Sequence, residues 1–124
     1  MNADKKIAVI IINWKKYDLT LNCIDSVLKS SYKNFKIILI DNESQNRFSD
    51  EINKSGNIHI IKNEKNEGFA RANNQAVKYS IKNGFDYVLL LNNDTIIKND
   101  LIDSLIKQSS ILNQKIIQPL ILNY

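Results

Sequence analysis

Several residue types that mark specialised folds are scarce in this chain. Its single cysteine, Cys23, cannot form an internal disulfide, and the 124 residues hold only three glycines and one proline. The longest uninterrupted apolar run, residues 7–12, is far shorter than the roughly 20 residues that a membrane-spanning helix needs. The first residues lack the pattern of a signal peptide, so we expect a cytoplasmic protein. No repeat, linker or low-complexity tract divides the sequence, and residues 1–124 are expected to form one domain.

Charge of one sign is not concentrated in any segment. The net charge is +4, and the lysines are scattered along the chain rather than gathered in one stripe, so the sequence does not indicate a nucleic-acid partner. A mildly basic surface still suits anionic ligands and is compatible with peripheral contact at the inner face of the cell membrane. Cys23 lies among apolar residues at helical spacing, far in sequence from any histidine. This favours a packed, inert thiol over a reactive one.

Four apolar runs predict strands. The first two are rich in β-branched residues and apolar on both faces, which is typical of strands buried from both sides in a parallel sheet. The third is shorter, and the fourth is also expected to be buried. These runs cover residues 6–13, 35–41, 57–62 and 87–91. The polar stretch 42–55, between the second and third runs, is expected to hold at most one short helix.

Apolar residues at helical spacing follow the first and fourth strands. The first helix carries such residues up to Leu28, and Asp18 is expected to cap its start. The last helix is expected to begin at Asn99 or Asp100. Each of these segments separates one expected strand from the next apolar run.

A further helix is expected between the third and fourth strands, over about residues 69–83. It follows Gly68, and Gly84 is expected to end it. One face of this helix is expected to pack, and it carries Phe69, Ala72, Ala76 and Tyr79.

A last apolar run, residues 116–122, is interrupted by Pro119, which favours a sheet edge or a strand end over a central strand. Strands that alternate with helices over the whole length predict an α/β fold with a mostly parallel sheet flanked by helices. In such sheets ligands bind beyond the carboxyl ends of the strands. The residues that follow each strand are therefore the candidates for function.

Polar residues follow all four expected strands, and the second strand ends on an aspartate, Asp41. A dinucleotide-binding Rossmann domain would need a glycine-rich turn after the first strand, and none of the three glycines lies there. If a diphosphate binds here, something other than the backbone amides of such a turn must supply the positive charge that balances it. A divalent metal at Asp94 would supply it, because Mg²⁺ and Mn²⁺ are commonly held by one or two carboxylates together with substrate phosphates and water. Residues 92–94, Asn-Asn-Asp, could equally be a simple turn.

Four segments, taken together and in this order, resemble the family 2 glycosyltransferases, especially their bacterial rhamnosyltransferase-like members. They are Val-Ile-Ile-Ile-Asn-Trp at 9–14, Ile-Asp-Asn-Glu-Ser at 40–44, Asn-Glu-Lys-Asn-Glu-Gly-Phe-Ala-Arg-Ala-Asn-Asn at 63–74, and Leu-Leu-Leu-Asn-Asn-Asp-Thr at 89–95. The resemblance spans nearly the whole chain. It implies a GT-A fold, of which this chain would be the Rossmann-like nucleotide-binding half.

The resemblance also implies roles for individual residues. Asn13 and its neighbours would line the base pocket, Asp41 would hydrogen-bond a uracil or thymine base, and Asp94 would bind the metal of a DxD-type motif. An ionised carboxylate only accepts hydrogen bonds, so Asp41 suits the N3–H of a pyrimidine; the alternative is a solvated turn residue. The full nucleotide-binding set expected from the sequence is Asn13, Trp14, Asp41, Asn42, Arg71, Asn92 and Asn93, with Asp94 as the metal ligand.

For three aromatic or basic residues, structural alternatives stay open. Arg71 could face the diphosphate near the start of its helix or could be a plain surface arginine. Trp14 could flank the donor or pack against the first helix. His59 alternates with isoleucines in the third expected strand and is interpreted as structural.

One part of the family pattern is absent from these 124 residues. Inverting members carry the general base, an aspartate, well beyond the metal aspartate, and no residue here is assigned that role. We therefore expect a truncated donor domain, without the acceptor half, that binds a UDP- or dTDP-sugar for transfer with inversion to a glycan or lipid-linked acceptor in polysaccharide biosynthesis. The alternative is a non-catalytic nucleotide-binding or assembly module that forms a homodimer through an uncovered sheet edge.

Overall fold

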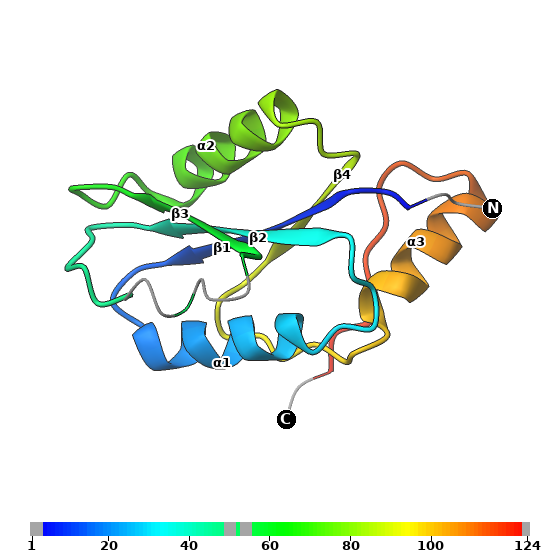
Figure 1. Cartoon of the computed structure of the whole chain (residues 1–124), viewed down its shortest axis with the longest axis horizontal. Helices are drawn as coiled ribbons and strands as arrows, with labels where there is room; N and C mark the ends of the chain where they lie inside the picture. The colour runs from blue at the N-terminus through cyan, green and yellow to red at the C-terminus, as the bar shows by residue number, and fades with distance from the viewer. Residues whose placement is uncertain (1–3, 49–51, 53–55, 123–124) are drawn as a thin grey trace.

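The computed structural model of the chain describes residues 4–48, 52 and 56–122. Strands and helices alternate along it (Figure 1). The elements are β1 (Ile7–Asn13), α1 (Tyr17–Leu28), β2 (Phe35–Asp41), β3 (Ile58–Lys62), α2 (Phe69–Lys82), β4 (Tyr87–Leu91) and α3 (Leu101–Leu112).

The four strands form one parallel sheet in the order β3-β2-β1-β4. Strand β1 pairs with β2 from Ile7 opposite Phe35 to Asn13 opposite Asp41, and with β4 from Ile7 opposite Tyr87. The expected α/β class and largely parallel sheet are confirmed. Because all strands run in one direction, the loops that follow β1, β2 and β3 lie together, at the left of Figure 1.

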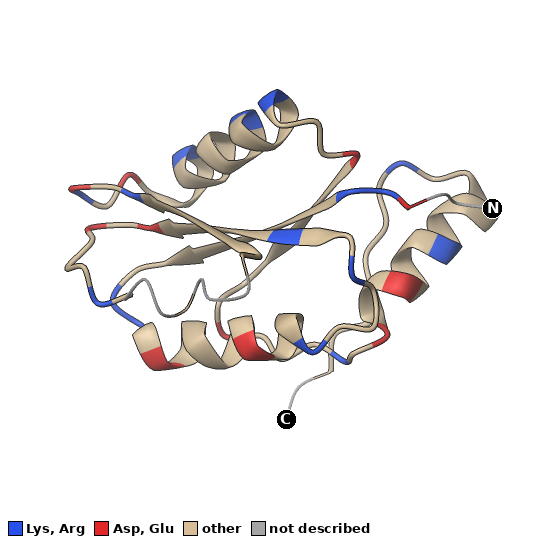
Figure 2. Ribbon diagram, viewed as in Figure 1, with Lys and Arg blue, Asp and Glu red and all other residues tan. Residues whose placement is uncertain are grey.

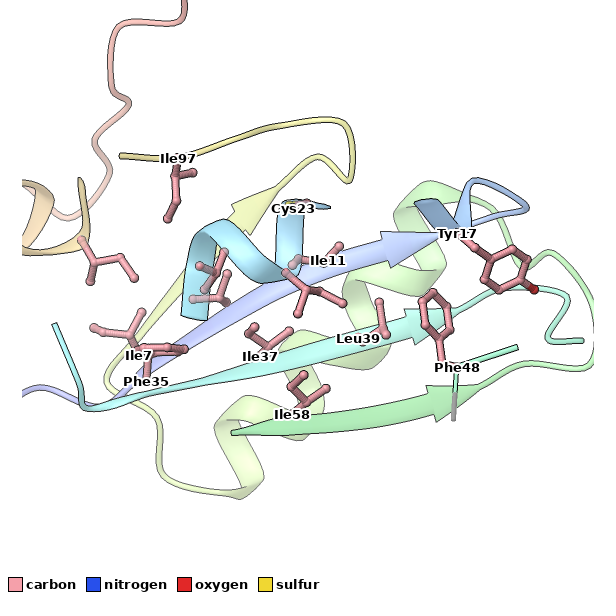
Figure 3. Close-up of a cluster of buried hydrophobic side chains, with 14 residues drawn as sticks. Ile7, Ile11, Tyr17, Cys23, Phe35, Ile37, Leu39, Phe48, Ile58 and Ile97 are labelled. Atoms are coloured by element: carbon pink, nitrogen blue, oxygen red, sulfur yellow. The ribbon is translucent and has the colours of Figure 1, made fainter. Parts of the chain in front are cut away.

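Helices cover both faces of the sheet, with α2 on one face and α1 and α3 on the other (Figure 1). The face under α2 is formed by alternate residues such as Ala8 and Ile38, and it meets Ala72 and Ala76 of the helix. These small side chains let α2 lie close to the strands. The opposite face is larger and holds the cluster drawn in Figure 3. Each isoleucine or leucine fully buried there stabilises the fold by about 1.5–3 kcal/mol.

Strand β4 differs from the buried strand that its sequence led us to expect. It lies at an edge of the described sheet, and Tyr87, Val88 and Leu90 are exposed, Leu90 to 55%. The expectation was wrong because an apolar sequence shows that a strand is suited to burial, but not whether another element covers it. Within the described part of the chain, no strand pairs with the outer edge of β4.

The helix ends agree with the sequence except at α1. Asp18 does not cap this helix: Lys16 occupies the N-cap position, and no side chain hydrogen-bonds the first turn. Asp18 lies inside that turn, where its carboxylate still favours the positive end of the helix dipole. Gly84 does end α2, with φ of +70° and its amide bonded to the carbonyl of Ile81.

The expected strand character of residues 116–122 is also wrong. These residues have no regular secondary structure, and apolar side chains among them are exposed, Ile116 to 91%. The outer edge of β4 is free, but none of these residues pairs with it or with another described strand. Pro119 lacks the amide hydrogen that such pairing would use. Of the polar stretch 42–55, residues 49–51 and 53–55 lie outside the described residues.

Charged residues are distributed over the whole fold. Figure 2 shows Lys and Arg on α2, on the sheet and in the loops, interspersed with Asp and Glu. Across the described residues, no helix is both long enough and apolar enough to span a bilayer.

Candidate functional site

A cleft of about 440 Å³ opens at the carboxyl ends of the strands. Its walls come from the ends of β1 and β4, the loop after β2 and the start of α2. The lining residues are Ile12, Trp14, Lys16, Asn42, Asn66, Gly68, Phe69, Asn73, Leu90, Leu91, Asn92, Asn93 and Asp94. Five of the eight residues that the sequence indicated are thus brought together here. Of the others, Asn13 and Asp41 are buried at the ends of β1 and β2, and Arg71 lies elsewhere.

Asn13 and Asp41 form a buried polar pair at the ends of β1 and β2. The side-chain amide of Asn13 donates to Oδ1 of Asp41 at 3.0 Å, and the hydroxyl of Ser44 donates to Oδ2 at 2.7 Å. Both Asn13 and Asp41 are completely shielded from solvent. The alternative in which Asp41 is a solvated turn residue is therefore wrong.

Trp14 lies at the rim of the cleft rather than packed under the first helix. Its ring is about half exposed, and Nε1 donates to Oε2 of Glu43 at 2.7 Å. Lys15 Nζ lies 3.6 Å from the same carboxylate oxygen. The hydrogen bond from Trp14, and then the charge of Lys15, hold the pKa of Glu43 below its usual value.

The two loops joined by this contact have unusual backbone conformations. Lys15 has φ of 60° and Glu43 has φ of 53°, a left-handed region that costs a side-chain-bearing residue about 1 kcal/mol. The hydrogen bond from Trp14 to Glu43 thus joins the loops that follow the neighbouring strands β1 and β2. No sequence pattern pairs Glu43 with Trp14, because the two residues are 29 positions apart.

A network of amide side chains holds the loops on the β2 side of the cleft. Asn63 and Gln75 exchange two hydrogen bonds, at 2.8 and 3.0 Å, and Asn63 also donates to Asn42 at 2.8 Å. Asn42 in turn donates to Asn66 at 3.2 Å. The network ties the loop after β2 to the loop before α2, and sequence reasoning assigned no role to Asn63, Asn66 or Gln75.

The N-terminus of α2 contributes Gly68 and Phe69 to the cleft. Gly68 has φ of +81°, and the amides of the first turn have no carbonyl partner inside the helix, so they favour an anion at this end. Phe69, expected to pack with Ala72 and Ala76, is instead 66% exposed and lines the cleft. This expectation failed because Phe69, the first residue of α2, lies at the cleft, whereas Ala72 and Ala76, one and two turns later, pack against the sheet.

Arg71 is not among the residues that line the cleft. Its guanidinium pairs with Oε2 of Glu67 at 3.0 Å, one turn earlier, and its side chain is largely exposed. In this arrangement it is a surface arginine. Lys16, which was not among the residues expected to bind the nucleotide, lines the cleft as a cation.

Asn92, Asn93 and Asp94 follow β4 and line the cleft. The amide of Thr95 donates to the carbonyl of Asn92 at 3.2 Å, which closes these residues into a turn. The same turn lines the cleft, so the turn that the sequence allowed and a position in the cleft are compatible. Asp94 is exposed. Among the described residues, none pairs with its carboxylate, and no group of three or more His, Cys, Asp or Glu side chains gathers there or elsewhere.

Cys23 lies below this turn and is inert, as expected. It is completely buried, and its Sγ lies 3.6 Å from the carbonyl oxygen of Asn92. Burial, with a smaller contribution from the charge of Asp94, raises the pKa of the thiol to about 11. The structural interpretation of His59 is likewise supported, since its ring stacks on Tyr79 at 4.2 Å between centroids.

Solved structures with the same arrangement of elements define the class of fold. The mannosyltransferase PcManGT from Pyrobaculum calidifontis, in complex with GDP-Man and Mn²⁺, matches with a TM-score of 0.75 at 14% identity, over 88% of this chain and 33% of that one. Residues 1–349 of S. aureus TarS, in complex with UDP-GlcNAc, match with a TM-score of 0.69 at 16% identity, over 86% and 31%. The fold is that of the GT-A glycosyltransferases.

The sequence comparisons narrow this class to one family. The chain belongs to glycosyl transferase family 2, whose profile matches residues 8–122. Among curated relatives, the dTDP-rhamnosyl transferase RfbF of Shigella flexneri is 25% identical over 120 residues, which cover 97% of this chain and 40% of that protein. The chain thus spans less than half the length of this relative. The resemblance to rhamnosyltransferase-like members is confirmed at the level of the family.

Proposed function

We propose that this chain is the donor-binding part of a glycosyltransferase and binds a UDP- or dTDP-sugar in the cleft. The observation that carries the proposal is the exposed carboxylate of Asp94 in a cleft that Lys16 and the N-terminus of α2 also line. Such a cleft suits a diphosphate with its cation, and the half-exposed ring of Trp14 offers a flat surface for a base. The fold likeness to proteins solved with GDP-Man and with UDP-GlcNAc supports the same ligand class.

The residues present fit a divalent metal of the Mg²⁺ or Mn²⁺ type. The described residues offer Asp94 and no multi-residue ligand cluster, which suits ions that take their other ligands from substrate phosphates and water. The ion would offset the negative charge that develops on the leaving diphosphate. The protein's own part is to hold Asp94 at the cleft wall and to place Lys16 and the α2 amides near the phosphates.

At the base end, we propose that Asn13, Asp41 and Asn42 shape the pocket for uracil or thymine. Asn42 lines the cleft, whereas Asn13 and Asp41 are completely shielded and hydrogen-bond each other. Each oxygen of Asp41 keeps a second lone pair, so a base that reached it would find an acceptor still available. Asn92 and Asn93 would lie toward the ribose and phosphates.

A further part of the proposal concerns the reaction of the whole enzyme, of which this chain would be one part. We propose transfer of the sugar, with inversion at its anomeric carbon, to a glycan or lipid-linked acceptor, with the general base supplied from outside these residues. We place the protein in the cytoplasm, in peripheral contact with the inner face of the membrane, which the net charge of +4 supports. Co-sedimentation with anionic but not neutral vesicles tests that placement.

Calorimetric titration of UDP and dTDP, with and without Mn²⁺, tests the donor and metal parts together. In the wild type, Mn²⁺ should tighten UDP binding about tenfold or more. Asp94→Ala should lose this gain. The matched control is Asp100→Ala, because Asp100 is an exposed aspartate six positions later that makes no side-chain cap bond, and it should keep the gain. Equal affinity in all conditions would remove the metal from the proposal.

A second candidate, a dimeric nucleotide-binding or assembly module, is favoured by the uncovered β4 edge. Apolar residues of β4, α3 and the C-terminal segment line a second groove of about 550 Å³. Sedimentation velocity separates the two candidates. A tight dimer without nucleotide affinity supports the module, and a monomer that binds UDP supports the transferase.

A further inference from the structure

A continuous line of side-chain hydrogen bonds runs from Asn93, which lines the cleft, to the buried carboxylate of Asp41. Asn93 donates from Nδ2 to Oγ1 of Thr20 at 3.0 Å, and Thr20 donates to Oδ1 of Asn13 at 2.6 Å. Asn13 then donates from Nδ2 to Oδ1 of Asp41 at 3.0 Å, and Ser44 donates to Oδ2 of the same carboxylate at 2.7 Å. The line therefore runs from the turn after β4, through α1 and β1, to the loop after β2.

The direction of each bond in this line is fixed by chemistry. An ionised Asp41 can only accept, so the side chain of Asn13 must turn its Nδ2 toward it and its Oδ1 toward Thr20. The hydroxyl of Thr20 has one proton, which it gives to Asn13, and its lone pairs accept from Asn93. Thr20, Asn13 and Asp41 are all completely buried. Water therefore cannot easily replace a missing member, and the loss of one leaves its neighbours unsatisfied.

Thr20 is the point where α1 meets the turn that carries Asp94. Two further residues on the same face of α1, at spacings of three, contact residues 92–97: Cys23 Sγ lies 3.6 Å from the carbonyl oxygen of Asn92, and Ser26 Oγ accepts from the amide of Ile97 at 3.2 Å. Figure 1 shows this segment running beside α1. The side chain of Asn93 is thus held by the helix, while the next residue, Asp94, is exposed at the cleft wall.

We propose that Thr20 is a positioning residue that couples the base end of the cleft to the metal end. It does not line the cleft, so it acts through Asn93 on the placement of Asp94 and through Asn13 on the placement of Asp41. This inference rests on the proposed function for its ligands, a pyrimidine nucleoside diphosphate and a divalent cation. Binding at one end would favour the hydrogen-bonded arrangement that the other end requires.

The first measurement is the factor by which Mn²⁺ tightens UDP binding. Thr20→Val, which keeps the shape but removes the hydroxyl, should lower this factor about fivefold or more. Thr20→Ser, which restores the hydroxyl, should recover it. The matched control is Ser80→Ala, because the hydroxyl of Ser80 is equally buried but bonds the carbonyl of Ala76 within its own helix. It should leave the factor unchanged.

A second measurement needs no nucleotide and separates failure of this inference from failure of the proposed function. Hydrogen exchange of the free chain should rise in Thr20→Val both in segment 92–97 and in segment 41–44, and not in Ser80→Ala. Asn93→Ala removes the hydrogen bond between Asn93 and Thr20 from the other side, and it replaces Thr20→Val in this measurement if that variant does not fold. It should raise hydrogen exchange in the same two segments. A wild type that fails to bind UDP overturns the proposed function, while the exchange pattern still decides the role of Thr20. Unchanged exchange at 41–44, or an unchanged Mn²⁺ factor in a folded Thr20→Val, overturns the coupling.

Discussion

Strands β2 and β4 both pair with β1 in parallel, yet they are built into the fold differently. Strand β2 is buried along its length and ends on the shielded Asp41, whereas β4 is largely exposed and is followed by the exposed Asp94. The β2 side holds its carboxylate with two side-chain donors. The comparison shows that the carboxylate after β2 is satisfied by donors of the protein itself, whereas the carboxylate after β4 is exposed and has no partner among the described residues.

The largest expected effect contrasts one leucine from each strand. Leu39→Ala should destabilise the chain by about 2–5 kcal/mol, because the buried side chain leaves a cavity in the cluster of Figure 3. Leu90→Ala should cost less than about 1 kcal/mol, because Leu90 already lies half in solvent. Urea unfolding measures both. Equal costs would mean that β4 is covered in solution and would break the comparison.

A smaller effect is expected from the two carboxylates. Asp41→Asn places an amide where two donors need an acceptor and should cost about 1–3 kcal/mol. Asp94→Asn should change stability by less than about 0.5 kcal/mol. The thermal midpoints of the two metal-free variants provide the measurement. A marked loss in Asp94→Asn would indicate that this carboxylate has a structural role.

High pH should weaken the side of the fold next to β4. Burial raises the pKa of Cys23 from 9.0 to about 11, so the folded state keeps a proton that the unfolded state loses. Its contribution is fully present below pH 9 and is lost as the pH rises toward 11. Denaturant unfolding of the wild type and of Cys23→Ala across this range should show a shallower decline in the variant. Parallel declines would contradict the shift.

Low pH should weaken the opposite edge of the sheet, and this is the smallest effect. Burial, with a contribution from Lys36, lowers the pKa of His59 below its usual 6.5. The stability that the neutral ring provides is present above pH 6.5 and is lost as the pH falls through the lowered pKa. His59→Phe, which keeps a ring against Tyr79, should reduce the loss between neutral and mildly acidic pH. An unchanged profile would show that His59 titrates as a solvated histidine.

The sequence predicted most of the sheet because apolar runs and helical spacing are local signals. The runs around Ile10 and Ile38 identified β1 and β2, and Gly84 correctly marked the end of α2. Coverage is not a local property, so the exposure of β4 and of residues 116–122 was missed. The cap assigned to Asp18 failed because helix α1 begins one residue before it.

Residues of the candidate site could be predicted from the sequence where they directly follow a strand. Residues whose place in the site depends on contacts with partners distant in sequence could not. Position after the strands correctly brought Trp14, Asn92 and Asp94 to one cleft. Thr20 gave no signal, since its bond to Asn93 spans 73 positions and a buried threonine on a helix resembles any other. Arg71 lies near the start of a helix, as the sequence predicted, but its guanidinium pairs with Glu67 one turn earlier and does not line the cleft.

The chain contains a single tryptophan, and that indole lies at the rim of the cleft with its ring nitrogen bonded to a carboxylate. Its fluorescence therefore originates from one known place, next to where a ligand would rest. A molecule that covers the ring or disturbs the bond to Glu43 should alter the intensity or wavelength of the emission. The unlabelled protein thus carries its own optical reporter, suited to screening candidate ligands one after another.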